Sequence, residues 1–110
     1  MCIRDSVSGV DDLEAASALL RALANPHRLA IVRALAEGPR CVHELVDALG
    51  ASQPLVSQHL RVLRAEDLVT AQRRGRETAY ALADHHVTHI VNDAVAHARE
   101  DRPRTEEQNP

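Results

Sequence analysis

The last segment with helical spacing, residues 83–100, has the residue types of a metal-binding site. It carries four of the seven histidines of the chain, together with three carboxylates, among apolar residues. His86 and His97 are eleven positions apart, so on a helix they lie on nearly the same face but about 16 Å apart along the axis. Two side chains this far apart cannot bind one metal ion together.

An antiparallel copy of the same helix would bring such groups together. It would set Asp84 and His86 of one chain beside His97 and Glu100 of the other. The spacing therefore predicts a symmetric homodimer with two identical metal sites that use nitrogen and oxygen ligands.

The composition predicts one small domain made mainly of helices. Its 110 residues can form a core with little to spare, which favours additional burial through oligomerisation. Tyr80 is the only aromatic residue, so the core must consist of Leu, Val, Ile and Ala. There is no run of about 18 apolar residues, and residues 1–6 lack the apolar centre of a secretion signal. We therefore expect a cytoplasmic protein that does not contact a membrane, with Cys2 and Cys41 as reduced thiols.

Positive charge is concentrated in the middle of a chain whose net charge is −3. Residues 52–82 contain five arginines and three acidic residues, whereas residues 83–110 contain three arginines and six acidic residues. The chain has no lysine, and arginine forms bidentate hydrogen bonds with phosphates and guanine edges. GC-rich coding would also explain this use of arginine. The distribution of charge is therefore compatible with a nucleic-acid interface in residues 52–82.

Local signals divide the chain into a leader, a helical domain and a tail. Residues 1–9 show no periodicity and are expected to be a disordered leader, and residues 101–110 a disordered, solvated tail. The domain between them, residues 10–100, starts with a helix capped by Asp11 or Asp12 that runs to about Ala24. A second helix is expected from Pro26 to Ala36, because proline suits the first turn of a helix.

Residues 41–63 have the pattern of a helix-turn-helix. A short helix, a tight turn at Gly50 and a second helix capped by Ser52 follow one another, with apolar residues facing inward on both helices. Periodicity alone would also fit an ordinary helical hairpin. The second helix favours DNA binding, because amide and hydroxyl groups can read base edges and arginine can contact phosphates. Its candidate DNA-binding residues are Ser52, Gln53, Ser57, Gln58, His59, Arg61 and Arg64.

Two β-prone runs follow, in residues 68–82, and flank a basic tip. The tip contains Arg73, Arg74 and Arg76 around Gly75, and we expect a hairpin with a loop of four to five residues. After a helix-turn-helix, a basic hairpin is typical of a wing that contacts the phosphate backbone or the minor groove. The alternative is a solvated loop without a function.

Three segments together resemble the ArsR/SmtB family of metal-sensing winged-helix repressors. They are residues 23–31, residues 52–63, and Gly75-Arg76 with Tyr80 in the hairpin, within a resemblance that covers about residues 19–100. The resemblance implies a winged helix-turn-helix fold that is mainly α with a small β-hairpin wing, in the order α-α-α-α-β-β-α. It also implies a homodimer joined through its first and last helices. Such a dimer would bind a double-stranded operator, an inverted repeat, and would release it when metal binds.

The resemblance implies a metal site on the C-terminal helix. The family pattern there is Asp-x-His followed by His-x-x-Glu or His-x-x-His, and Asp84, His86, His97 and Glu100 match it at every position. Asp84 would lie at the start of the helix, where it could also cap it. Two imidazoles and two carboxylates in a four-coordinate site suit Zn²⁺. His89 is a possible accessory ligand, which would raise the coordination number toward that preferred by Ni²⁺ or Co²⁺, or it could orient another ligand.

The second metal site of the family is built on the first helix of the helix-turn-helix. Cys41 and Glu44 match its positions, but His43 replaces the second cysteine of the arsenic-sensing pattern, so arsenite sensing is not expected. A lone cysteine is more often a structural residue than a ligand.

The sequence therefore predicts a metal-responsive repressor, most simply one that senses zinc. The alternatives within the family are sensing of nickel or cobalt, and sensing of thiol oxidation through Cys41. A zinc hydrolase that uses His86 and His97 is a remote alternative, because such an enzyme needs an open coordination position and a general base in a pocket. We expect no enzymatic activity and no small organic substrate.

Overall fold

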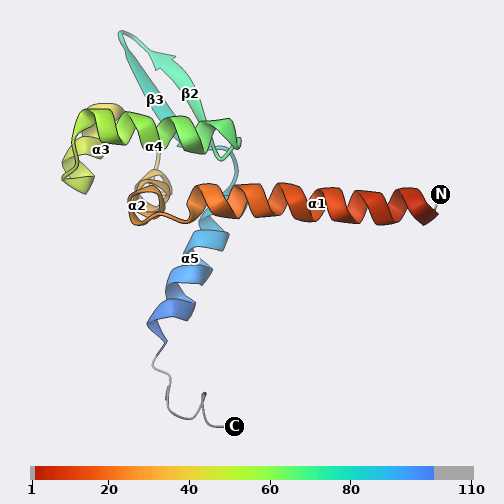
Figure 1. Cartoon of the computed structure of the whole chain (residues 1–110). Coiled ribbons are helices and arrows are strands. Elements are labelled where there is room, and N and C mark those ends of the chain that lie inside the picture. The colour runs from red at the N-terminus through yellow and green to blue at the C-terminus, as the bar shows by residue number, and fades with distance from the viewer. Residues whose placement is uncertain (1, 101–110) are drawn as a thin grey trace.

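A computed structural model of the chain describes the backbone of residues 2–100 and the side chains of residues 9–100. Four helices are followed by a β-hairpin and a last helix, which confirms the predicted winged helix-turn-helix fold; Figure 1 shows how these elements are arranged. The helices are α1 (Cys2–Leu23), α2 (Pro26–Leu35), α3 (Val42–Leu49), α4 (Gln53–Ala65) and α5 (His85–Arg99). The strands are β1 (Arg40–Cys41), β2 (Val69–Arg74) and β3 (Glu77–Leu82).

The first helix is longer than predicted. It begins at Cys2 instead of at Asp11 or Asp12, so residues 2–9, expected to be a disordered leader, are helical. Nothing in this stretch ends a helix, because it contains no proline and one glycine, Gly9. Figure 1 shows the N-terminal half of α1 extending away from the other elements. The predicted tail, residues 101–110, lies outside the described residues.

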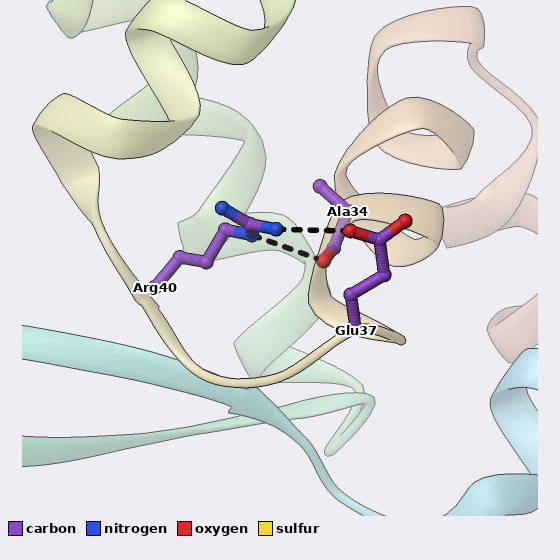
Figure 2. Close-up of polar contacts among 3 residues, drawn as sticks. All are labelled: Ala34, Glu37 and Arg40. Carbon is purple, nitrogen blue, oxygen red and sulfur yellow. Dashed lines mark hydrogen bonds and ion pairs between the residues drawn. The ribbon is translucent and has the colours of Figure 1, made fainter.

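The second helix begins where the sequence predicts. The side chain of Asn25 accepts hydrogen bonds from the backbone N–H groups of His27 and Arg28, at 2.8 and 3.2 Å, and Pro26 occupies the first turn. After α2 the chain turns into β1, and Arg40 holds this turn (Figure 2). Its Nε donates to the carbonyl oxygen of Ala34 at 3.1 Å, and its Nη2 forms an ion pair with Glu37 at 3.1 Å.

The predicted helix-turn-helix is formed by α3 and α4. Gly50 ends α3 with a φ of 68°, in the left-handed region that glycine adopts easily, and its N–H donates to the carbonyl oxygen of Val46. The hydroxyl of Ser52 then caps α4 by accepting a hydrogen bond from the N–H of Leu55 at 3.3 Å.

The sheet differs from the predicted hairpin in two ways. It has three antiparallel strands in the order β1-β3-β2. The additional strand, β1, was not predicted; it has two residues and pairs with Ala79 and Tyr80 of β3. The turn of the wing is also tighter than predicted. Arg73 and Arg74 belong to β2 and pair with β3, so that Gly75 and Arg76 alone connect the strands. Backbone pairing continues to the tip because Gly75, with a φ of 65°, adopts the left-handed conformation that lets the chain reverse direction between the two strands.

The core is aliphatic, as the composition predicts. Tyr80 packs against it and is partly buried, and α5 covers the core from the side of α2. Among the described residues, no helix is long and apolar enough to cross a membrane. The largest fully buried side chains are Ile31, Val32, Leu45, Val56, Leu60, Leu63, Leu68 and Val91.

Candidate metal centre and nucleic-acid interface

The predicted DNA-binding residues of α4 lie on its exposed side, with one exception. Ser52, Gln53, Gln58, Arg61 and Arg64 are exposed, and Ser57 is partly buried. The helix is amphipathic, because the side chains three and four positions apart on its other side enter the core. The surface that remains carries hydroxyl and amide groups near the N-terminus and two guanidinium groups nearer the C-terminus.

The exception is His59, and its assignment to DNA contact is wrong. The side chain is 7% exposed, and its Nδ1 lies 3.2 Å from Nη1 of Arg28 on α2. Its ring stacks on that of His27, with the centroids 5.4 Å apart. Position 59 is three residues after Val56 and one before Leu60, both of which are buried. It therefore falls on the edge of the core-facing side of α4, where it cannot contact DNA.

Burial favours the neutral form of His59. It lowers the pKa of the imidazole below that of an exposed histidine, and the positive charge of Arg28 and the neighbouring His27 ring act in the same direction. Arg28 also donates from Nε to the carbonyl oxygen of Ala22, so this group of residues joins the end of α1, the start of α2 and the middle of α4. His59 thus belongs to the packing of α4 against the start of α2.

The three arginines of the wing are all exposed and follow the hairpin to its tip. Between α4 and the wing there is an open hollow of about 450 Å³. Ser57, Arg61 and Arg64 line it from the helix, and Tyr80 lines it from β3. Tyr80 is not among the predicted DNA-binding residues, although its position in the wing, as the only aromatic residue of the chain, could have indicated it. The hollow combines two guanidinium groups with a phenol and a hydroxyl, which are suitable donors for a phosphate.

At the other end of the molecule, α5 starts beneath the sheet and runs away from it (Figure 1). Asp84 caps this helix, as predicted, by accepting a hydrogen bond through Oδ1 from the N–H of His86 at 2.9 Å. The same oxygen lies 3.4 Å from Nδ1 of His86. Both side chains are mostly exposed, at 53% and 75%. One pair of predicted ligands is therefore held together, open to solvent, by the cap of the helix.

The other pair of predicted ligands lies at the C-terminal end of α5. His97 is in the last turn, and the N–H of Glu100, the residue that ends the helix, donates to the carbonyl oxygen of His97 at 3.3 Å. Since α5 is one continuous helix, His86 and His97 are separated by about 16 Å of helix axis. Among residues 9–100, whose side chains the structure describes, one protomer gathers no group of three histidine, cysteine or acidic side chains that could hold an ion. The four residues nevertheless have the donor atoms that fit Zn²⁺, two imidazole nitrogens and two carboxylates.

Cys41, in the second predicted metal site, is buried at the start of α3. Its side chain is 5% exposed, and its backbone N–H donates to Oε1 of Glu44 at 2.7 Å, so that Glu44 serves as part of the helix cap. A hydrogen bond from the thiol to the carboxylate of Glu77 raises the pKa of Cys41, and burial and the charges of Glu77 and Glu44 raise it further. A thiol that stays protonated is a poor nucleophile and a poor metal ligand. These surroundings disfavour both thiol oxidation and a working metal site at Cys41.

Comparison with known proteins agrees with this architecture. The model of the family described as "Bacterial regulatory protein, arsR family" matches residues 25–71, which run from the cap of α2 into β2. The HTH-type transcriptional repressor SmtB of Mycobacterium tuberculosis is 66% identical over 89 residues, which are 81% of this chain and 66% of that protein. The chain thus spans about two thirds of the length of this relative.

Solved structures give the same result. The transcriptional repressor BigR from Xylella fastidiosa is 30% identical with a TM-score of 0.71, over 93% of this chain and 100% of that one. A homodimeric winged helix-turn-helix DNA-binding domain from Mycobacterium bovis, of a possible ArsR-family transcriptional regulator, is 30% identical with a TM-score of 0.74, over 84% and 87% of the two chains. These relatives are transcriptional regulators and not enzymes. The chain belongs to the ArsR family of bacterial regulatory proteins.

Proposed function

We propose that this chain is a zinc-responsive transcriptional repressor, which binds operator DNA as a metal-free dimer and releases it when metal binds at α5. The observation that carries the proposal is the pairing of Asp84 and His86 at one end of α5, with His97 and Glu100 near the other. The similarity to the SmtB repressor supports the repressor function.

The surface of α1 and α5 supports a dimer. Leu13 and Leu20 of α1 are 72% and 52% exposed, which is unusual for large apolar side chains on a small domain. An apolar hollow of about 200 Å³ is lined by Leu20 and by other residues of α1, α2 and α5 that include Leu29 and Ile90. A second copy of the chain, packed through its own α1 and α5, would cover these side chains. It would also set the N-terminal end of one α5 beside the C-terminal end of the other.

The exposed polar residues of α4 and the arginines of the wing support binding to operator DNA. In the proposed complex the α4 helices of a dimer enter successive major grooves of an inverted repeat, and the wings contact the flanking backbone. Metal binding between the two α5 helices favours a dimer whose α4 helices no longer match the spacing of the half-sites. Coupling of this kind typically amounts to about 1–3 kcal/mol, and it is reciprocal, so operator DNA must weaken metal binding by the same factor.

The test is the affinity for operator DNA, first selected from a random library, measured with and without Zn²⁺. We expect Zn²⁺ to weaken binding by the wild-type chain by about 5-fold to 150-fold. His97→Ala should bind DNA equally well and lose the response, whereas Asn92→Ala, an exposed change on the same helix, should keep it. A wild-type affinity that Zn²⁺ does not change, or a His97→Ala variant that still responds, would disprove the proposed site.

Nickel or cobalt is the second candidate for the sensed metal. His89, an exposed histidine on α5, is an additional ligand that these ions could use. The same DNA-binding measurement with Ni²⁺ and Co²⁺ decides between the metals. A response to either ion without a response to Zn²⁺ would keep the site and overturn the choice of zinc.

A further inference from the structure

A cluster of three imidazoles at the start of α5 extends beyond the ligands assigned above. His85, His86 and His89 are all exposed and lie within one turn of the helix. The rings of His85 and His86 are stacked, with centroids 4.7 Å apart and an angle of 26° between their planes. The rings of His85 and His89 meet edge to face, with centroids 5.6 Å apart and an angle of 86°. His85 has no part in the proposed sensing site.

We propose that His85 and His89 form a second divalent-metal site, contained in one protomer, for late first-row transition ions such as Ni²⁺. Residues four positions apart lie on one face of a helix, and two histidines at this spacing are a well-known way to bind a metal ion. The site needs neither His97 nor a second chain. It therefore does not depend on the proposed zinc-responsive function.

The geometry of the two rings supports this choice of pair. A nitrogen bound at about 2.0–2.1 Å places each ring centroid roughly 3 Å from the ion, so two rings on one ion can have centroids up to about 6 Å apart. The 5.6 Å between His85 and His89 lies within this limit. A metal ion lies in the plane of each ring that binds it. The nearly perpendicular rings of His85 and His89 can point nitrogens at one ion, whereas the stacked rings of His85 and His86 cannot do so as they stand.

The surroundings of the pair are suitable for a hydrated ion. Both rings are exposed, so water can complete the coordination shell, and the described residues provide no third ligand in position. His86 is engaged elsewhere, since its Nδ1 lies 3.4 Å from Asp84. A two-histidine site of this kind favours Ni²⁺ and Cu²⁺ over Mn²⁺ or Fe²⁺, in the usual order of affinity for nitrogen ligands.

The experiment measures Ni²⁺ binding to the full chain carrying His97→Ala, which removes the site expected between protomers. Equilibrium dialysis against Ni²⁺ alone gives the stoichiometry and the affinity, and circular dichroism checks that each variant keeps its helices. We expect roughly one Ni²⁺ per protomer. Adding His85→Ala or His89→Ala should weaken binding by about 10-fold to 100-fold, because attachment at two points becomes attachment at one.

Two further variants separate this site from its neighbours. Adding His86→Ala, which removes a ring outside the pair, should weaken binding less than either change within the pair does. The combination of His89→Ala with Asn92→His keeps the number of histidines but breaks the spacing of four, and binding should stay weak. In NMR spectra, paramagnetic Ni²⁺ should broaden the ring signals of His85 and His89 before those of His43 on α3.

The proposal is overturned if neither His85→Ala nor His89→Ala weakens binding. It is also overturned if His86→Ala weakens binding as much as they do, because Ni²⁺ would then be held by Asp84 and His86. These results concern only Ni²⁺ binding to His85 and His89. The proposed function is tested by a different measurement, the effect of Zn²⁺ on DNA affinity, so the two proposals can fail independently.

Discussion

Nδ1 of His59 lies 3.2 Å from Nη1 of Arg28, and this contact joins the recognition helix α4 to α2. A neutral imidazole can accept a hydrogen bond from the guanidinium, whereas a protonated one cannot and would also be repelled by it. The fold therefore requires the neutral form of His59. Since α4 carries the candidate base-reading residues, the protonation of one buried side chain bears on the placement of the whole interface.

The stability of the domain should fall below neutral pH because of His59. Its pKa is lowered in the folded chain, so at mildly acidic pH the unfolded chain binds a proton at this position that the folded chain does not. The contribution of His59 to stability is complete above the pKa of an exposed histidine, about 6.5, and is lost as the pH falls from there through the lower pKa of the folded chain. Denaturant unfolding at pH 7.5 and 5.5 measures the loss.

His59→Gln should reduce this pH dependence, and at pH 7.5 it should cost about 1–3 kcal/mol of unfolding free energy because the buried contact with Arg28 is altered. The matched control is His43→Gln, which changes an exposed histidine on α3. Equal pH dependence in the wild type and in His59→Gln would show that another group is responsible.

Removing Arg64 should weaken DNA binding without changing sequence preference. Its side chain lines the hollow between α4 and the wing together with Arg61 and Tyr80, where a phosphate can be bound. For Arg64→Ala we expect lower affinity for all sequences, and a slope of log affinity against log salt that is smaller by about 1. Fluorescence anisotropy over a range of salt concentrations, without metal, measures both quantities.

Gln58→Ala should behave differently, because an amide reads base edges. We expect a loss of about 1–3 kcal/mol of discrimination at one base position and little change in the salt slope.

The control for Arg64→Ala is Arg99→Ala, at the end of α5, which removes the same charge far from the wing (Figure 1). Equal effects of Arg64→Ala and Arg99→Ala would mean that only net charge matters.

The thiol of Cys41 should react slowly at neutral pH. Its raised pKa keeps it protonated, and the side chain is buried. In a Cys2→Ser background, alkylation by iodoacetamide at pH 7.5 should be much slower in the folded chain than in denaturant, and it should accelerate as the pH rises above 9. Glu77→Gln should lower the pKa of Cys41 and increase the rate. A fast reaction in the folded chain at pH 7.5 would instead support thiol-based sensing.

Two substitutions of Asp84 should separate its capping role from its proposed ligand role. Asp84→Ala removes the cap of α5 and should cost about 1 kcal/mol of unfolding free energy. Asp84→Asn keeps an oxygen that can accept from the N–H of His86, so stability should remain close to that of the wild type. Both variants should bind Zn²⁺ more weakly if the carboxylate is a ligand. Wild-type zinc affinity in Asp84→Asn would limit Asp84 to a structural role.

The local elements of this chain could be read from the sequence because their signals are local. Asn25-Pro26, Gly50, Ser52 and Asp84 start or end helices through contacts with residues two to four positions away, and the structure confirms each of these boundaries. The helix-turn-helix and the wing follow from the same kind of information. The four-ligand site between protomers stays a prediction, because it depends on a second chain.

Only the tertiary structure decided the burial and the pKa of individual side chains, because these depend on contacts between distant segments. Gln58 and His59 are adjacent polar residues in one helix, and only the packing of α2 against α4 shows that one is exposed and the other is buried beside Arg28. The pKa of Cys41 likewise depends on Glu77, which is distant in sequence and is brought close by the pairing of β1 with β3. By itself the sequence determined which residues start, end and line each element, because backbone capping and helical periodicity act over a few residues. The fold decided which side chains are buried and therefore cannot bind DNA or react, because burial depends on which surfaces pack against each other.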